Sequence, residues 1–261
     1  MKGRMALLLA TLLAGCATLP APSGWQTHAP GLDYRRLTPL PHSVVHALRV
    51  DLHSAAVQVA VSPPQERGLS VDQMPSSRSA LAAVNGSFFD GQFTPRGLTV
   101  SDGVAWQPVL AVESSPLLAC DAARRCVIEL RPPSAPQPQW QQVLAGTPWL
   151  LDQGRQRSDA DDATCPSLCA TAHPRTAVGL DAAGRYLYLV TVEGRRAPVA
   201  GLNLAQLSAV MASLGAQQAF NLDGGGSSSL LLIGQAVMSR PFNEPQQRRV
   251  ANALQVHRAT P

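Results

Sequence analysis

Lysine is almost absent from this sequence of 261 residues, because Lys2 is the only one. Beyond the N-terminus the chain therefore has no residue for a Schiff base, a Ser–Lys dyad or a Walker-type phosphate loop. The patterns G-x-S-x-G and H-E-x-x-H do not occur either, which excludes the commonest serine-hydrolase elbow and zinc-protease signatures. Arginine must therefore supply the cationic binding of any anionic ligand.

Net charge is also low. The whole sequence carries +4 at pH 7, and residues 1–15 hold two cations and no acid, so the remainder carries only +2. This balance favours neither a nucleic-acid partner nor a strongly anionic one.

The N-terminus predicts export. Lys2 and Arg4 precede the short apolar run MALLLATLLA, which ends at LAGC. A basic start, a short apolar region and small residues are typical of a signal peptide, and the run is too short to span a bilayer. Cys16 after Leu-Ala-Gly resembles the bacterial lipoprotein signal, which implies cleavage before Cys16 and a lipid on its thiol. Because residue 17 is Ala rather than Asp, we expect anchoring at the periplasmic face of the outer membrane; an ordinary signal peptide with a chance cysteine is the alternative.

Four further cysteines stand at positions 120, 126, 165 and 169. An exported protein meets an oxidising compartment, so two disulfides are expected, with the local pairs Cys120–Cys126 and Cys165–Cys169 favoured over crossed pairs. A metal site built from all four thiolates is the rival interpretation, although neither spacing is the usual one of zinc knuckles.

The remaining pattern predicts a Pro-rich tether over residues 16–40 and one domain over residues 41–258. Alternating apolar and polar residues predict strands in most of this domain, including a pair formed by residues 44–52 and 56–62. A Pro-rich stretch at 131–140 and a polar loop at 153–174 are expected to be insertions. One helix is clear, with Asn203 and Gln206 as a capping box and Gly215 as its end. We therefore expect an α+β fold with a strand-rich mixed sheet and few helices.

Three polar islands interrupt the apolar strands. The first is AAVNGSFFDG with Asn85, Gly86, Ser87 and Asp90; the second is HPRTAVGLD with Arg175 and Thr176; the third is NLDGGGSSS with Asp223, Gly224, Gly225, Gly226, Ser227 and Ser228. Polar groups at the ends of buried strands must pair with one another or line a cleft, because unpaired buried donors and acceptors are costly.

Together these islands suit a substrate with an anionic group beside a bond that needs proton transfer. Successive glycine amides can form an anion-binding concavity, and an arginine can bind an oxyanion with two parallel hydrogen bonds. A carboxylate next to them can act as acid, base or nucleophile. Each island alone also fits an ordinary turn or a surface arginine, and spacing does not prove that the three converge.

Four stretches, in this order, resemble the phosphodiester glycosidase family over about residues 44–256: AAVNGSFFD, HPRTAVGLD, VTVEGRRAPVAGLNLAQLSAVMASLGAQQAFNLDGGGSSSLLL and RRVANALQV. The resemblance implies hydrolysis of a sugar, N-acetylglucosamine-like, from a sugar-1-phosphodiester glycan. We expect no cofactor and no metal, although the sequence leaves metal dependence open. It points to Asp223, Glu193 and Arg175 as catalytic residues. Carried over position by position, it also points to a substrate-binding set: Asn85, Gly86, Thr176, Arg195, Asn221, Gly224, Gly225, Gly226, Ser227, Ser228 and Asn252.

Two other functions fit the same residues. A non-catalytic envelope lipoprotein would bind glycans or phosphate-bearing polymers in the same cleft without turnover. A metal-dependent phosphodiesterase would use Asp223, Asp90 and His173, and exhaustive chelation would abolish its activity.

Overall fold

The protein is described here by a computed structural model that covers residues 24–110, 115–133, 135–163, 165–241 and 243–259. The expected signal peptide, the lipidated Cys16 and the start of the tether lie outside these residues. Within them, no helix is both long and apolar enough to cross a membrane.

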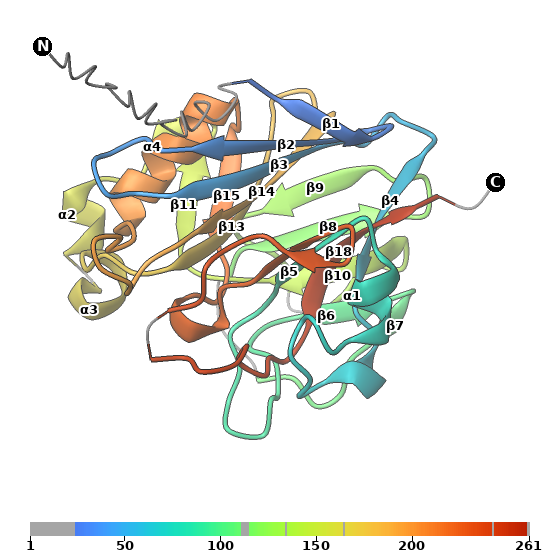
Figure 1. Cartoon of the computed structure of the whole chain (residues 1–261). Coiled ribbons are helices and arrows are strands. Elements are labelled where there is room, and N and C mark those ends of the chain that lie inside the picture. Colours follow the sequence, from blue (N-terminus) through green and yellow to red (C-terminus); the bar gives the residue numbers. More distant parts are fainter. Residues whose placement is uncertain (1–23, 111–114, 134, 164, 242, 260–261) are drawn as a thin grey trace, which may run out of the picture.

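Strands dominate the structure and form three sheets (Figure 1). The first sheet has the order β1 (Gln26–Ala29), β2 (Leu32–Leu37), β3 (Val45–Asp51), β14 (Tyr186–Val192), β13 (Arg175–Leu180), β15 (Gln218–Asn221), β11 (Trp149–Asp152) and β12 (Arg155–Gln156). The second has the order β7 (Val104–Ala105), β6 (Thr99–Ser101), β10 (Trp140–Ala145), β8 (Leu117–Asp121) and β9 (Cys126–Glu129). The third has the order β17 (Gln235–Ala236), β16 (Leu230–Leu232), β5 (Ala82–Asn85), β18 (Ala253–Arg258) and β4 (Val57–Val61).

Helices are few and, with one exception, short. They are α1 (Pro75–Ser79), α2 (Asp159–Asp162), α3 (Pro166–Cys169) and α4 (Leu204–Leu214), with 3-10 turns at Pro64–Glu66 and Gly225–Ser227. The expected α+β class with few helices is thus confirmed. The strands are distributed over three sheets rather than one, and every pair of neighbouring strands is antiparallel.

Two cores flank the first sheet because successive side chains on a strand point to opposite faces. Leu48, Val178, Leu189 and Phe220 point to one face and pack against the other sheets, including Val84 of β5. The opposite face is covered by α4, in the core cluster defined by these buried residues: Val45, Ala47, Ala177, Val190, Val192, Leu204, Leu207 and Met211.

Helix α4 forms as its sequence predicts. The Asn203 side chain accepts the Gln206 amide, the Gln206 side chain accepts the Asn203 amide, and Gly215 ends the helix in the left-handed conformation at φ 105°. The capping box and the glycine stop are therefore confirmed.

The expected tether is partly wrong. Residues 26–37 form the hairpin of β1 and β2, and β2 pairs along its length with β3 at the edge of the first sheet. The hairpin is ordered because Leu32 and Ala29 are buried in the core, and Gly31 takes the positive φ that its tight turn needs. The folded domain therefore begins well before residue 41.

The expected pairing of residues 44–52 with 56–62 is also wrong, although both segments are strands. β3 pairs with β2 and β14, whereas β4 pairs with β18 in the third sheet. Alternation of apolar and polar residues identifies a strand but not its partner, because the pattern shows only which face of the strand is buried.

The polar stretch 153–174 is more ordered than expected, since it contains β12, α2 and α3. Ser158 and Asp161 form a capping box at α2, and buried Arg157 bonds Asp162 with 2.5 Å between Nε and Oδ1. Both local disulfides, Cys120–Cys126 and Cys165–Cys169, are present, which rules out the four-thiolate metal site.

Candidate active site

The three polar islands meet at one end of the packed sheets. Asn85 ends β5, Arg175 begins β13 and Asn221 ends β15. Antiparallel registers place these ends together, because Ala177 pairs with Asn221 in the first sheet. The chain runs from Asn221 directly into Asp223 and the glycine loop.

Asn85 joins all three islands. Its side-chain amide donates to the Asp223 carbonyl at 2.6 Å, and its side-chain oxygen accepts the Thr176 hydroxyl at 2.6 Å and the Ser229 amide at 3.1 Å. Asn85 and Thr176 are fully buried. They therefore hold the glycine loop against the strands and do not line the cavity described below.

Three other expected binding residues have the same supporting position. The buried Asn252 side-chain oxygen accepts the Ser87 amide at 2.8 Å and fills the space that a side chain on Gly86 would need. The Gly86 carbonyl accepts the Asp223 amide at 3.0 Å. Asn221 donates to the Thr147 carbonyl at 2.9 Å.

Above this support lies a cavity of about 320 Å³. Its lining consists of Phe88, Ser167, Leu168, His173, Arg175, Arg195, Asp223, Gly224, Gly225 and Arg248. The lining contains three arginines and one carboxylate, which suits an anionic substrate beside a group that can transfer a proton.

Asp223 is the one carboxylate in this lining, and its pKa is raised to about 6. Burial is the main cause, because it disfavours the charged form. The nearby Ser227 hydroxyl, the Gly224 amide, which donates to Asp223 Oδ1 at 2.8 Å, and the charge of Arg248 oppose the shift. Near neutral pH the side chain can therefore both accept and release a proton.

The glycine loop does not offer the anion nest that the sequence suggests. The Gly224 amide bonds Asp223, and the Gly225 amide donates to the Pro174 carbonyl at 2.8 Å. The glycines instead allow close approach of side chains: Gly225, at φ +61°, lies under the Arg195 guanidinium, and Gly226 lies under Arg248. Because these glycines have no side chains, the guanidinium groups of Arg195 and Arg248 can pack directly on the loop.

Ser227 and Ser228 are buried beneath the loop and do not line the cavity. Among the described residues, neither hydroxyl forms a hydrogen bond, although the Ser227 hydroxyl lies near enough to Asp223 to favour its charged form. Both serines are therefore buried residues of the glycine loop that do not face the cavity.

Arg195 and His173 form the basic side of the cavity. Arg195 Nη2 lies 3.1 Å from His173 Nδ1, and His173 Nε2 lies 3.1 Å from the Ser167 carbonyl oxygen. Since a guanidinium only donates and a carbonyl only accepts, His173 is neutral with its proton on Nε2. Burial and the neighbouring arginines lower the pKa of His173, which agrees with this assignment.

Arg248 also lines the cavity, although nothing in the sequence indicated that it would lie there. It lies in RRVANALQV, a stretch that resembles the family, but its long separation from Asp223 hid their proximity. Its charge lowers the pKa of Asp223, and its side chain is 43% exposed.

Arg175 differs from its expected role. Because it alternates with Thr176 on β13, its side chain points to the α4 face, where Nε donates to the Leu202 carbonyl at 3.0 Å. Nη2 donates to the carbonyls of Leu168 at 2.6 Å and Thr171 at 2.8 Å. Burial lowers the pKa of Arg175 to about 10, so it stays charged at neutral pH. It supports the α3 wall of the cavity, and most of its donors are not available to a phosphate.

Glu193 does not line the cavity, contrary to its expected role as second catalytic carboxylate. Its Oε1 bonds His46 Nε2 at 2.8 Å and accepts the Ser239 amide at 3.0 Å. Burial raises the pKa of Glu193, but these hydrogen bonds outweigh burial and lower it overall. His46 Nδ1 in turn lies 2.8 Å from the Tyr34 hydroxyl. These hydrogen bonds join β2, β3 and the segment around Ser239, so Glu193 has a structural role here.

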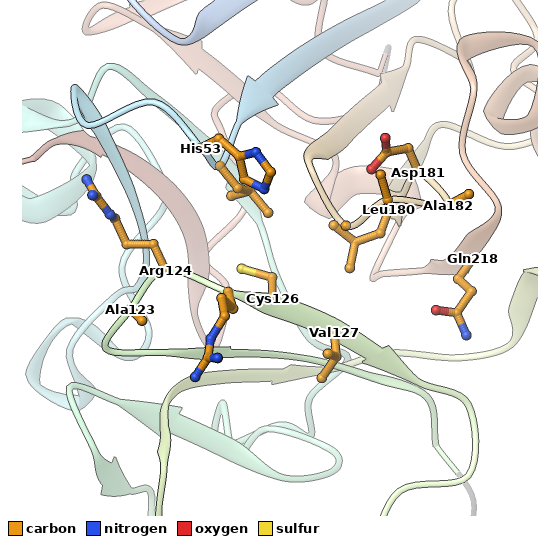
Figure 2. Close-up of a pocket in the computed structure, with 13 residues that line it drawn as sticks. His53, Ala123, Arg124, Cys126, Val127, Leu180, Asp181, Ala182 and Gln218 are labelled. Carbon is orange, nitrogen blue, oxygen red and sulfur yellow. The ribbon is translucent and has the colours of Figure 1, made fainter.

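A larger cavity of about 670 Å³ lies at the opposite end of β13, beside Leu180. Figure 2 shows the turn with Asp181 and Ala182 on one side and Arg124 on the other. Its charged groups are occupied: Asp181 accepts two backbone amides, and the neighbouring Arg125 pairs with Asp121. Size alone therefore does not identify the site, and the smaller cavity has the reactive groups.

Among the described residues, no three His, Cys, Asp or Glu side chains come close enough to hold a metal ion. Of the rival metal set, His173 and Asp223 line the cavity, whereas Asp90 accepts the amides of Gln92 and Thr94 within its own turn. Asp90 is thus a turn residue here.

The fold and the site define an α+β protein with a small basic cavity around a single carboxylate of raised pKa. The family model described as Phosphodiester glycosidase matches residues 78–257, more than half of the chain. The chain belongs to the phosphodiester glycosidase family. A comparison with curated protein sequences finds no match.

Solved structures share the fold. A hypothetical protein from Synechocystis is 16% identical with a TM-score of 0.72; the alignment covers 91% of this chain but only 64% of that protein. The catalytic domain of zebrafish N-acetylglucosamine-1-phosphodiester alpha-N-acetylglucosaminidase, auto-inhibited by its pro-peptide, is 20% identical with a TM-score of 0.70, covering 91% of this chain and 86% of that one. At these identities the likeness concerns the fold.

Proposed function

We propose that this protein hydrolyses a sugar-1-phosphodiester in the bacterial cell envelope and releases the sugar. The observation that carries this proposal is the placement of Asp223, with a pKa of about 6, in a cavity whose other charged groups are arginines. A phosphodiester has one negative charge, which Arg195 can bind. We expect the anomeric carbon of the sugar then to face Asp223, because Arg195 and Asp223 line the same cavity.

In this mechanism water attacks the anomeric carbon while the bond from that carbon to the phosphate oxygen breaks. Asp223 takes the proton of the water as general base, and the electron pair of the broken bond leaves with the phosphate. The leaving group departs as an anion that arginine stabilises, so it needs no second carboxylic acid, unlike in most glycosidases. The mechanism therefore does not need Glu193, which is bonded to His46 and Ser239 instead.

The sugar proposed is N-acetylglucosamine-like, in line with the family resemblance and with the substrate in the name of the zebrafish relative. The proposed location is the periplasmic face of the outer membrane, through a lipid on Cys16. The LAGC sequence supports this location, and the two disulfides suit an oxidising compartment.

The test is hydrolysis of a panel of sugar-1-phosphodiesters by the wild type, Asp223→Asn and the matched control Asp152→Asn. Asp152, on β11, does not line the cavity. We expect turnover by the wild type and the control, and loss of at least about a thousandfold in kcat for Asp223→Asn, an upper-range effect for a general base. Wild-type rates for Asp223→Asn would refute the assignment, and saturable binding without turnover would indicate a glycan-binding lipoprotein.

Two further readouts fix the chemistry. Hydrolysis in ¹⁸O-labelled water should place the label in the sugar; label in the phosphate would mean that the P–O bond breaks. Inversion at the anomeric carbon, followed by proton NMR, is expected for direct attack by water, whereas retention would make Asp223 the nucleophile. Activity after exhaustive chelation separates this mechanism from the metal-dependent one.

A further inference from the structure

One segment between β17 and β18 lies over the glycine loop and brings a second ion pair to the site. Glu244 Oε1 bonds Arg248 Nη2, and both groups occupy the space where a side chain on Gly226 would stand. The Glu244 side chain is 12% exposed and that of Arg248 is 43% exposed. A carboxylate and a guanidinium are therefore stacked directly on the loop that bears Asp223.

The segment is anchored on both sides of this pair. The Ser239 amide bonds buried Glu193, which is itself held by His46. At the other end, the Val250 amide donates to the Leu69 carbonyl at 3.0 Å, and Arg249 Nε donates to the Gly68 carbonyl. The position of the pair is thus set by the fold.

Arg248 interacts with two carboxylates, those of Asp223 and Glu244. It lines the cavity and lowers the pKa of Asp223 from one side, while Glu244 neutralises it from the other. Arg195 faces the same cavity across the loop, over Gly225. Arg195, Arg248 and Asp223 therefore line the cavity where an anion would bind, and Glu244 is bonded to Arg248 outside that lining.

We propose that Arg248 is the second phosphate-binding arginine and that Glu244 sets the charge that the site accepts. The inference deepens the proposed function and rests on it. A phosphodiester brings one negative charge to two cations and two anions. A phosphomonoester, the product of the proposed hydrolysis, carries between one and a half and two negative charges at pH 7, and the extra charge meets Glu244 and Asp223. Glu244 therefore favours the diester substrate and speeds release of the monoester product.

The test measures binding without turnover at pH 7.5, by calorimetry with two probes: phenyl phosphate, a monoester, and ethyl phenyl phosphate, a diester without a sugar. The variants are Glu244→Gln, Arg248→Gln and Arg248→Lys. Glu129→Gln on β9 and the exposed Arg78→Gln remove the same charges away from the cavity. Thermal unfolding verifies that each variant is folded.

We expect Glu244→Gln to bind phenyl phosphate about fivefold more tightly, the upper end for a partly exposed charge pair, with less than about a twofold change for the diester. Arg248→Gln should weaken both probes by about tenfold, and Arg248→Lys should recover part of the loss. An unchanged monoester-to-diester ratio in Glu244→Gln would overturn the role of Glu244, and unchanged binding in Arg248→Gln that of Arg248. If the wild type bound neither probe, both the proposed function and this inference would fail. If the wild type bound both probes and only the variants behaved otherwise than expected, the inference alone would fail.

Discussion

Replacing Asp223 with asparagine should stabilise the protein at alkaline pH while it removes activity. Burial raises the pKa of this carboxyl from 3.8 to about 6, which means that the folded state holds the proton more tightly than the unfolded chain does. Between these two pKa values the unfolded state binds fewer protons, so the free energy of unfolding falls as pH rises. The ionised carboxylate is therefore a cost that the folded protein bears above about pH 6.

The magnitude follows from the size of the shift. About two pKa units at 1.36 kcal/mol each correspond to about 3 kcal/mol, lost between about pH 4 and pH 6 and constant above that range. Asparagine has no such titration. The difference in unfolding free energy between Asp223→Asn and the wild type should thus be smallest at pH 4 and larger by about 3 kcal/mol at pH 8.

Urea unfolding at pH 4, 5, 6, 7 and 8, with both disulfides intact, measures this difference directly. Other titrating groups are common to both proteins and cancel to first order. A difference that stays constant across this range would show that the pKa of Asp223 is not raised, and it would remove the physical reason for treating Asp223 as the proton-transferring group.

Three other outcomes are expected. The wild-type kcat/KM should rise with pH through about 6 and then level off, because Asp223 acts in its ionised form; a profile that falls over this range would contradict a general base. Gly226→Ala should displace the flexible end of Arg248 and raise KM by about tenfold, whereas Gly91→Ala, with nothing within 4 Å of the new methyl group, should not; equal KM values would argue against close packing on the loop. Arg175→Lys should cost about 2–4 kcal/mol in urea unfolding and reduce activity, because one ammonium cannot replace bonds to three carbonyls; unchanged stability would show that these bonds are not important.

Local features were predictable from sequence because their causes are local. The capping box of α4, its Gly215 stop and the hairpin that joins Cys120 to Cys126 each depend on residues a few positions apart. The resemblance to the family also identified Asp223 and Arg195, which face the cavity together.

Strand partners and side-chain directions depended on the whole fold. The alternating pattern predicted β3 and β4 as strands but paired them with each other, although they belong to different sheets. Arg175 and Thr176 are neighbours in sequence, yet the pleat directs Arg175 to the α4 face and Thr176 to Asn85 on the opposite face. Glu193 was expected at the substrate and is instead bonded to His46, a residue 147 positions away.

The sequence by itself thus determined the composition of the site: one carboxylate in a glycine loop, arginine as the source of positive charge, and strands ending in polar residues. Only the tertiary structure decided which arginines face that carboxylate. Arg248 and Asp223 are separated by a long stretch of chain, and their proximity results from where the segment before β18 is anchored. The raised pKa of Asp223 has the same origin, because burial is a property of the packed molecule and not of any short stretch of residues.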